Sequence, residues 1–144
     1  MSTAMQVSRP NGERRLLQAA VLVAGCVPVL GGLAGVIMGS DVIQATSPDL
    51  ASSDSHVRYL SGLLLGIGLL FWSLIPKIER AGDLFRALTC LVVIGGLARL
   101  ASVAASGLPS RVMLGALVME LAVTPLLCLW QTQLELDRKH RSTK

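Results

Sequence analysis

The sequence predicts an all-α protein that folds as a four-helix transmembrane bundle. Its 144 residues are 52% hydrophobic and only 15% charged, with a mean hydropathy of +0.62, whereas a soluble domain carries about 25% charged residues. A hydrocarbon core of about 30 Å requires roughly 20 apolar residues of helix. Stretches of about this length or longer occur at about 16–39, 58–76, 84–106 and 111–130.

The first apolar stretch, 16–39, follows a polar N-terminal segment, residues 1–15. It is longer than the apolar region of about 7–15 residues in a signal peptide, so we expect an uncleaved span. Within it Gly31, Gly35 and Gly39 recur at every fourth position, a spacing that lets two helices approach closely in lipid. Packing against a helix of the same chain is the favoured interpretation. A homo-oligomer or a membrane partner is the alternative.

Polar segments separate the other spans. Residues 40–57 form the longest connection, which contains aspartates but neither Lys nor Arg. Residues 77–86 form a short charged loop, and the turn 107–110 joins the third span to the fourth. We therefore expect one membrane domain over residues 16–133, followed by a basic tail at 134–144.

The distribution of basic residues predicts the orientation. Ten of the 13 Lys and Arg residues fall in the N-terminal segment, the 77–86 loop and the tail. Arg58 and Arg111, by contrast, begin the second and fourth spans, on the opposite side of the membrane from those segments. Because cytoplasmic loops carry the excess of Lys and Arg, both termini are predicted to be cytoplasmic. The chain is thus expected to cross the inner (plasma) membrane several times, with the lipid bilayer as its partner.

Away from the ends of the spans, the only charged side chains are Arg99 and Glu120. The turn between their spans brings them to similar depths, roughly 10 and 13 Å at the helical rise. Charges within hydrocarbon normally face protein, water or one another. Pro125 cannot donate to the carbonyl of Leu121, so it leaves an acceptor beside Glu120. The sequence therefore predicts a polar locus in the outer half of the membrane.

Further polar side chains open the second span at its external end: Asp54, His56, Arg58 and Tyr59. Three interpretations of the locus remain open. The charge pair could serve only helix packing, in a structural or interaction subunit of a membrane complex. The locus could bind a small anionic or amphipathic ligand or assist transport, with Arg99 as its cation and Arg58 at its mouth. Finally, Glu120 and His56 could relay protons.

Other function classes lack support in the sequence. No Ser-His-Asp order, HExxH, P-loop or haem motif occurs, so neither an enzyme nor a cofactor is predicted. No basic stripe is interleaved with aromatic residues, so nucleic-acid binding is not expected. Cys26, Cys90 and Cys128 lie far apart in separate apolar stretches and are interpreted as small apolar residues, without a disulfide or a metal site.

Several motifs resemble those of an uncharacterised bacterial membrane family, domain of unknown function 4345. The resemblance covers roughly residues 16–133 and implies a four-helix bacterial membrane protein without an established activity. Some members carry a phage-infection name, which is compatible with a surface-accessible receptor or cofactor role. The motifs are Asp54-Ser-His56-Val-Arg58-Tyr59-Leu-Ser-Gly62, Gly95-Gly96-Leu-Ala-Arg99-Leu, Gly107-Leu-Pro109-Ser110, and Glu120 followed by Pro125 and Trp130-Gln131.

The predicted orientation can be tested with topology reporters. Fusions at Arg80 and at the C-terminus should report a cytoplasmic location, and a fusion at Ser52 should report an external one. The physical reason is the excess of basic residues in the segments that contain the first two sites. A cytoplasmic signal at Ser52 would contradict the four-span assignment.

Overall fold

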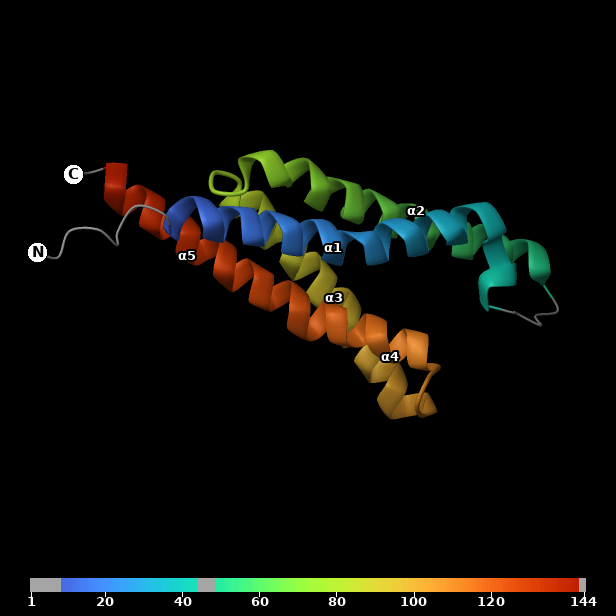
Figure 1. Ribbon diagram of the computed structural model, residues 1–144. Coiled ribbons are helices and arrows are strands. Elements are labelled where there is room, and N and C mark those ends of the chain that lie inside the picture. Colours follow the sequence, from blue (N-terminus) through green and yellow to red (C-terminus); the bar gives the residue numbers. More distant parts are fainter. Residues whose placement is uncertain (1–8, 44–48, 143–144) are drawn as a thin grey trace, which may run out of the picture. The chain divides into compact units, whose positions relative to one another are not determined.

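The computed structural model describes residues 9–43 and 49–142, in which every regular element is a helix (Figure 1). Two short 3-10 helices, η1 (Gly39–Ile43) and η2 (Ile75–Lys77), follow the first two α-helices, and a π-helical turn, η3 (Met119–Val123), joins the last two. The α-helices are α1 (Arg9–Met38), α2 (Leu50–Leu74), α3 (Gly82–Ser106), α4 (Arg111–Val118) and α5 (Thr124–Ser142).

Four helical segments are long and apolar enough to cross a membrane: Gly12–Asp41, Leu50–Lys77, Gly82–Ser106 and Arg111–His140. They confirm the predicted all-α class with four helices of transmembrane length. The fourth segment runs through α4, η3 and α5, and α5 extends to Ser142, well into the polar tail. The helical spans are thus longer than their apolar stretches.

The second span begins earlier than the apolar pattern indicated. Residues 50–57, which the sequence assigned to the polar connection, form the start of α2, while 44–48 lie outside the described residues. Asp49 caps this helix, because its Oδ1 accepts a hydrogen bond from the Ser52 backbone N–H at 3.1 Å. Hydrogen bonds from Ser52, through its side chain and its backbone, lower the pKa of the Asp49 carboxyl from its ordinary value.

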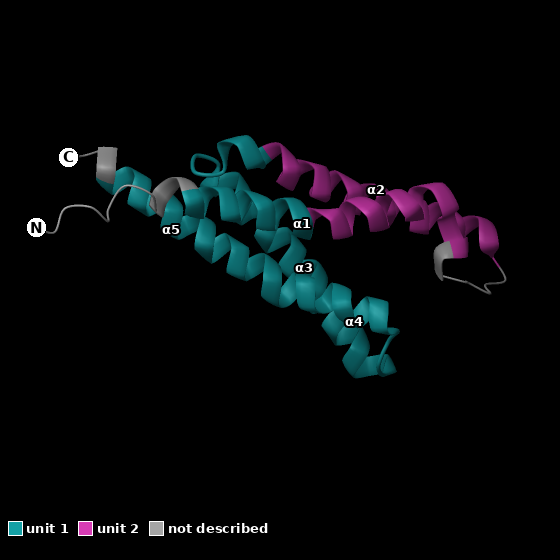
Figure 2. Ribbon diagram, in the orientation of Figure 1, with its two compact units in different colours: residues 1–24, 74–144 teal, residues 25–73 magenta. Residues whose placement is uncertain are grey.

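The described chain divides into two compact units (Figure 2). Unit 1 contains residues up to 24 and from 74 onward, and unit 2 contains residues 25–73, so that α1 contributes to both. Unit 2 is a hairpin of α1 and α2, held together by close backbone approach. A Cβ atom on Gly32 would lie 2.6 Å from the backbone nitrogen of Leu65.

The predicted packing of the α1 glycines against a helix of the same chain holds for two of the three positions. Gly35 and Gly39 do face α2, where added Cβ atoms would collide with Ser61 and Asp54. Gly31 does not, because no described residue lies within 4 Å of a Cβ added there. The inward face instead follows Gly25, Gly32 and Gly39 at seven-residue intervals, which correspond to about two helical turns.

The core of unit 1 is formed where the start of α1, the loop between α2 and α3, and α5 meet. Near the 107–110 turn, by contrast, Leu108 and Val112 are each 81% exposed. Gly96 is the buried residue in the second half of α3, where an added Cβ would lie 2.9 Å from the Cβ of Glu120. The buried apolar side chains of unit 1 are Leu17, Val21, Leu74, Ile78, Phe85, Leu88 and Leu134.

The fourth span changes its winding beside Pro125. Both the backbone N–H and the Oγ1 of Thr124 donate to the carbonyl of Met119, with the hydroxyl at 2.8 Å. This i to i−5 pattern is a π-helical turn, which widens the helix just before a proline whose ring would crowd the carbonyl of Leu121. The predicted perturbation beside Glu120 is therefore a π-turn.

Adjacent glycines of α1 provide a matched test of the unit 2 interface. Gly32→Ala should lower the stability of the purified protein in detergent by about 1–3 kcal/mol, because the new methyl group overpacks the contact with Leu65. Gly31→Ala should leave the melting temperature unchanged or slightly raised, since alanine forms helix better than glycine and space is open there. Equal losses in the two variants would contradict this packing.

Candidate functional site

The predicted charge pair is formed. The Arg99 guanidinium donates from Nε to Glu120 Oε2 and from Nη2 to Glu120 Oε1, both at 3.1 Å. The side chains are 33% and 17% exposed, respectively. Such a bidentate arrangement is the strongest geometry for an arginine–carboxylate pair. It joins α3 to the π-turn η3 of the fourth span.

A third contact completes the hydrogen bonding of the Arg99 guanidinium. Arg99 Nη1 donates to the sulfur of Met113 on α4 at 2.9 Å. Each of the three guanidinium nitrogens thus has a partner within unit 1, although a thioether is only a weak acceptor. Gly96 permits this arrangement because the absence of its side chain lets α3 approach the backbone that carries Glu120.

Asp54 and Arg58 form a second, separate group, which ends α1 in unit 2. Arg58 donates from Nε to Asp54 Oδ2 at 2.7 Å and from Nη1 to the carbonyls of Val36 and Ile37 at 2.5 and 3.0 Å. Asp54 Oδ1 accepts from the Ser40 backbone N–H at 2.9 Å. These contacts satisfy backbone groups that the end of a helix leaves unpaired.

The end of α1 also depends on Gly39. Its φ of +61° is the left-handed conformation that glycine adopts at a helix terminus. Asp54 and Arg58 lie directly against it, where an added Cβ would collide with the Asp54 carboxylate. The geometry therefore gives this pair a capping role in the hairpin of unit 2.

His56 and Tyr59 lie on another face of α2. Both are exposed, and together with Ala51, Ser52 and Ser55 they line an open hollow. The six predicted site residues consequently fall into three groups. Arg99 and Glu120 belong to unit 1, whereas the capping pair and the hollow belong to unit 2.

The sequence did not predict the most buried polar groups, which surround the loop between α2 and α3. We call the loop carbonyls of residues 75–78 and the three side chains that bind them the loop junction. Gln18 Nε2 donates to Ile75 O at 2.8 Å, Arg14 Nη2 to Pro76 O at 3.2 Å, and Gln131 Nε2 to Ile78 O at 2.9 Å. Gln131 has no exposed surface.

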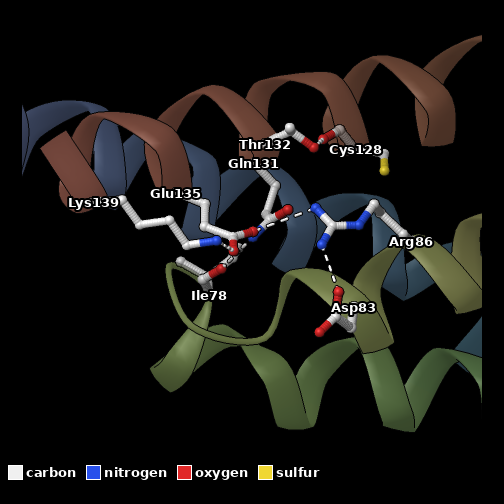
Figure 3. A network of polar contacts seen from close by, with 8 residues as sticks. All are labelled: Ile78, Asp83, Arg86, Cys128, Gln131, Thr132, Glu135 and Lys139. Atoms are coloured by element: carbon white, nitrogen blue, oxygen red, sulfur yellow. Dashed lines mark hydrogen bonds and ion pairs between the residues drawn. The ribbon is translucent and has the colours of Figure 1, made fainter.

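Ion pairs continue from the loop junction along α5 (Figure 3). Glu135, only 8% exposed, accepts from Arg86 Nη1 at 3.4 Å and from Lys139 Nζ at 2.7 Å, while Arg86 also binds Asp83 at 2.6 Å. The Glu135 carboxylate lies over Gly82 at the start of α3, where an added Cβ would collide with it. The positive end of the α3 dipole stabilises a carboxylate at this position.

A weak signal for these residues was present in the sequence. Gln131, Glu135 and Lys139 recur at every fourth position just after the last apolar stretch, so they share one helical face. The segment was interpreted only as a polar tail, because composition does not show which face packs against protein. Among the described residues, no group of three or more His, Cys, Asp or Glu side chains could hold a metal ion.

The four apolar helices and the paired intramembrane charges define a small multi-pass membrane protein. Residues 16–131 match the family model described as "Domain of unknown function (DUF4345)". The chain belongs to this family, which confirms the predicted family resemblance. A search of curated proteins and a search of solved structures find no significant match.

The charge pair can be tested by a double-mutant cycle. Arg99→Ala or Glu120→Ala alone should lower stability and folded yield more than the two changes together, because each single change leaves an unpaired, partly buried charge. Breaking a buried pair costs about 3–5 kcal/mol, and the partial exposure of Arg99 places the expected loss at or below the lower end. A double variant as poor as the sum of both single variants would show that the residues are not coupled.

Proposed function

We propose that the protein is a non-catalytic structural or interaction subunit of a complex in the bacterial inner membrane. The bidentate contact between Arg99 and Glu120 carries the proposal. Both carboxylate oxygens are engaged by the guanidinium, so the intramembrane charges neutralise each other within the chain. In this role the pair fixes α3 against the fourth span and selects one register between them.

Both termini are proposed to be cytoplasmic, and the loop junction supports this orientation. Gln18 and Arg14 near the start of α1 and Gln131 on α5 all bind the loop between α2 and α3. Three segments rich in Lys and Arg are therefore gathered at one end of unit 1. The positive-inside rule assigns such an end to the cytoplasm.

Small residues that the chain leaves open could admit a partner helix. No atom of the described residues lies within 4 Å of a Cβ added at Gly31, Gly95 or Gly115. In lipid, association between helices depends on close packing and on hydrogen bonds rather than on apolar surface alone. A second copy of the chain or another membrane protein is accordingly the proposed partner, with Gly31 on the face of α1 that α2 does not cover.

A second candidate function is the binding of a small anionic or amphipathic ligand, or assistance in its transport. One observation favours it. Arg99 is 33% exposed, and among the described residues its third nitrogen, Nη1, is bound only by the sulfur of Met113. A carboxylate or phosphate is a much stronger acceptor than a thioether, so a ligand could replace this contact without breaking the pair with Glu120.

Cysteine labelling separates the two functions. Ser102→Cys lies on α3 near Arg99 and is placed in a background where Cys26, Cys90 and Cys128 are alanine. If the pair is a packing device, Ser102 faces lipid or a partner, and a charged, membrane-impermeant thiol reagent added outside should not react with it.

Ser110→Cys, in the turn before α4, is the matched control and should react rapidly with the same reagent. Rapid reaction at Ser102→Cys in a protein that keeps the wild-type melting temperature would show a water-filled opening. That result would favour the ligand-binding function over the structural one.

A further inference from the structure

Arg14 and Arg138 of unit 1 are partly buried cations for which the described part of the chain provides no carboxylate. Among described side chains, Arg86 and Arg99 have comparable exposure, and both are paired with acids. An arginine remains ionised at any physiological pH, so it cannot avoid the cost of burial by losing its proton. Within the described residues, the charges of Arg14 and Arg138 are therefore left to solvent or to an anion from outside the chain.

Both guanidinium groups also include a nitrogen for which the described residues provide no hydrogen-bond acceptor. Arg14 donates to the carbonyl of Pro76 through Nη2, but its Nε is enclosed without an acceptor. The Nε of Arg138 is likewise enclosed and has no hydrogen-bond partner among the described residues. A guanidinium presents five N–H donors, and because the Nε atoms are enclosed, the terminal Nη groups are the donors that an external anion would reach.

Both arginines lie where the candidate spans end. Arg14 is one helical turn beyond Gln18, and Arg138 is two turns beyond Gln131, so they lie about 6 and 10 Å farther along their helices than the side chains that bind the loop. Both displacements point toward the same end of unit 1, because α1 starts and α5 ends at that end. The headgroup layer on each side of the hydrocarbon is about 5–8 Å deep. Arginine side chains of this length reach it readily.

We propose that Arg14 and Arg138 bind the phosphate groups of anionic phospholipids at the rim of the loop junction. A phosphate offers a guanidinium two parallel acceptors, and basic pockets between membrane helices suit lipid headgroups. Inorganic phosphate shares this chemistry, but a lipid phosphate is held at the required depth by its acyl chains. This inference goes beyond the proposed structural role and holds for either orientation, since both leaflets contain phosphates.

Native mass spectrometry of the full chain, released from detergent with added phosphatidylglycerol, provides the test. Arg14→Gln and Arg138→Gln should each reduce the retained lipid about tenfold, the effect of losing one charge-assisted interaction. Arg15→Gln is the matched control, because it removes the same charge from an exposed neighbour of Arg14 and should retain lipid as the wild type does. Equal loss in all three variants, or none in the first two, would overturn the proposal.

A measurement on the wild-type protein keeps the test decisive if the variants fail to fold. Phosphatidylglycerol should raise the melting temperature above that found with phosphatidylcholine of the same acyl chains, and inorganic phosphate should not. The absence of any difference between the two lipids would contradict the proposal. An equal rise with inorganic phosphate would assign the site to a free anion and reject the lipid.

Discussion

The backbone carbonyls of residues 75–78 set the arrangement of unit 1. They lie in the loop that leads into α3, and a buried carbonyl without a donor lowers the free energy of unfolding. Gln18, Arg14 and Gln131 supply the donors, and they come from the beginning of α1 and from α5. Three separate parts of the sequence are thereby held together by a single loop, and most of the buried apolar side chains of unit 1 surround it.

The two ends of unit 1 are stabilised by different means. At the loop junction, side chains from several elements bury Gln131 and Glu135 almost completely. Near the 107–110 turn, α3 meets α4 and η3, and the bidentate pair of Arg99 with Glu120 joins α3 to η3. A salt bridge specifies one partner and one register, which an apolar contact between two helices in lipid does not.

Unit 2 relies on glycine and on a cap. Gly32 brings α1 against the backbone of α2, and Gly39 allows the chain to leave α1 in a left-handed conformation. Arg58 and Asp54 then bind the backbone groups that this ending leaves unpaired. Two residues that resemble an external binding site in the sequence are thus explained by helix termination, whereas His56 and Tyr59 remain exposed on α2.

The sequence alone determined that the chain is helical, that four segments can cross a membrane, and which family it belongs to. These properties follow from composition and local order, because a helix of about 20 apolar residues pairs its backbone groups internally and can therefore cross the hydrocarbon core. The pairing of Arg99 with Glu120 could also be predicted, since one short turn places both at similar depths. The orientation of the termini stays a prediction.

Only the tertiary structure decided which faces meet. Gly31 and Gly32 are equivalent in composition and adjacent in sequence, yet only Gly32 contacts α2, because a rotation of one residue changes the face. At the π-turn Met119–Val123, the backbone N–H and the hydroxyl of Thr124 both donate to the carbonyl of Met119, whereas Pro125 has no N–H to donate. Gln131 is buried because a loop more than fifty residues earlier lacks a donor. The spacing of Gln131, Glu135 and Lys139 indicates that they share one helical face, but it does not show that this face meets a distant loop.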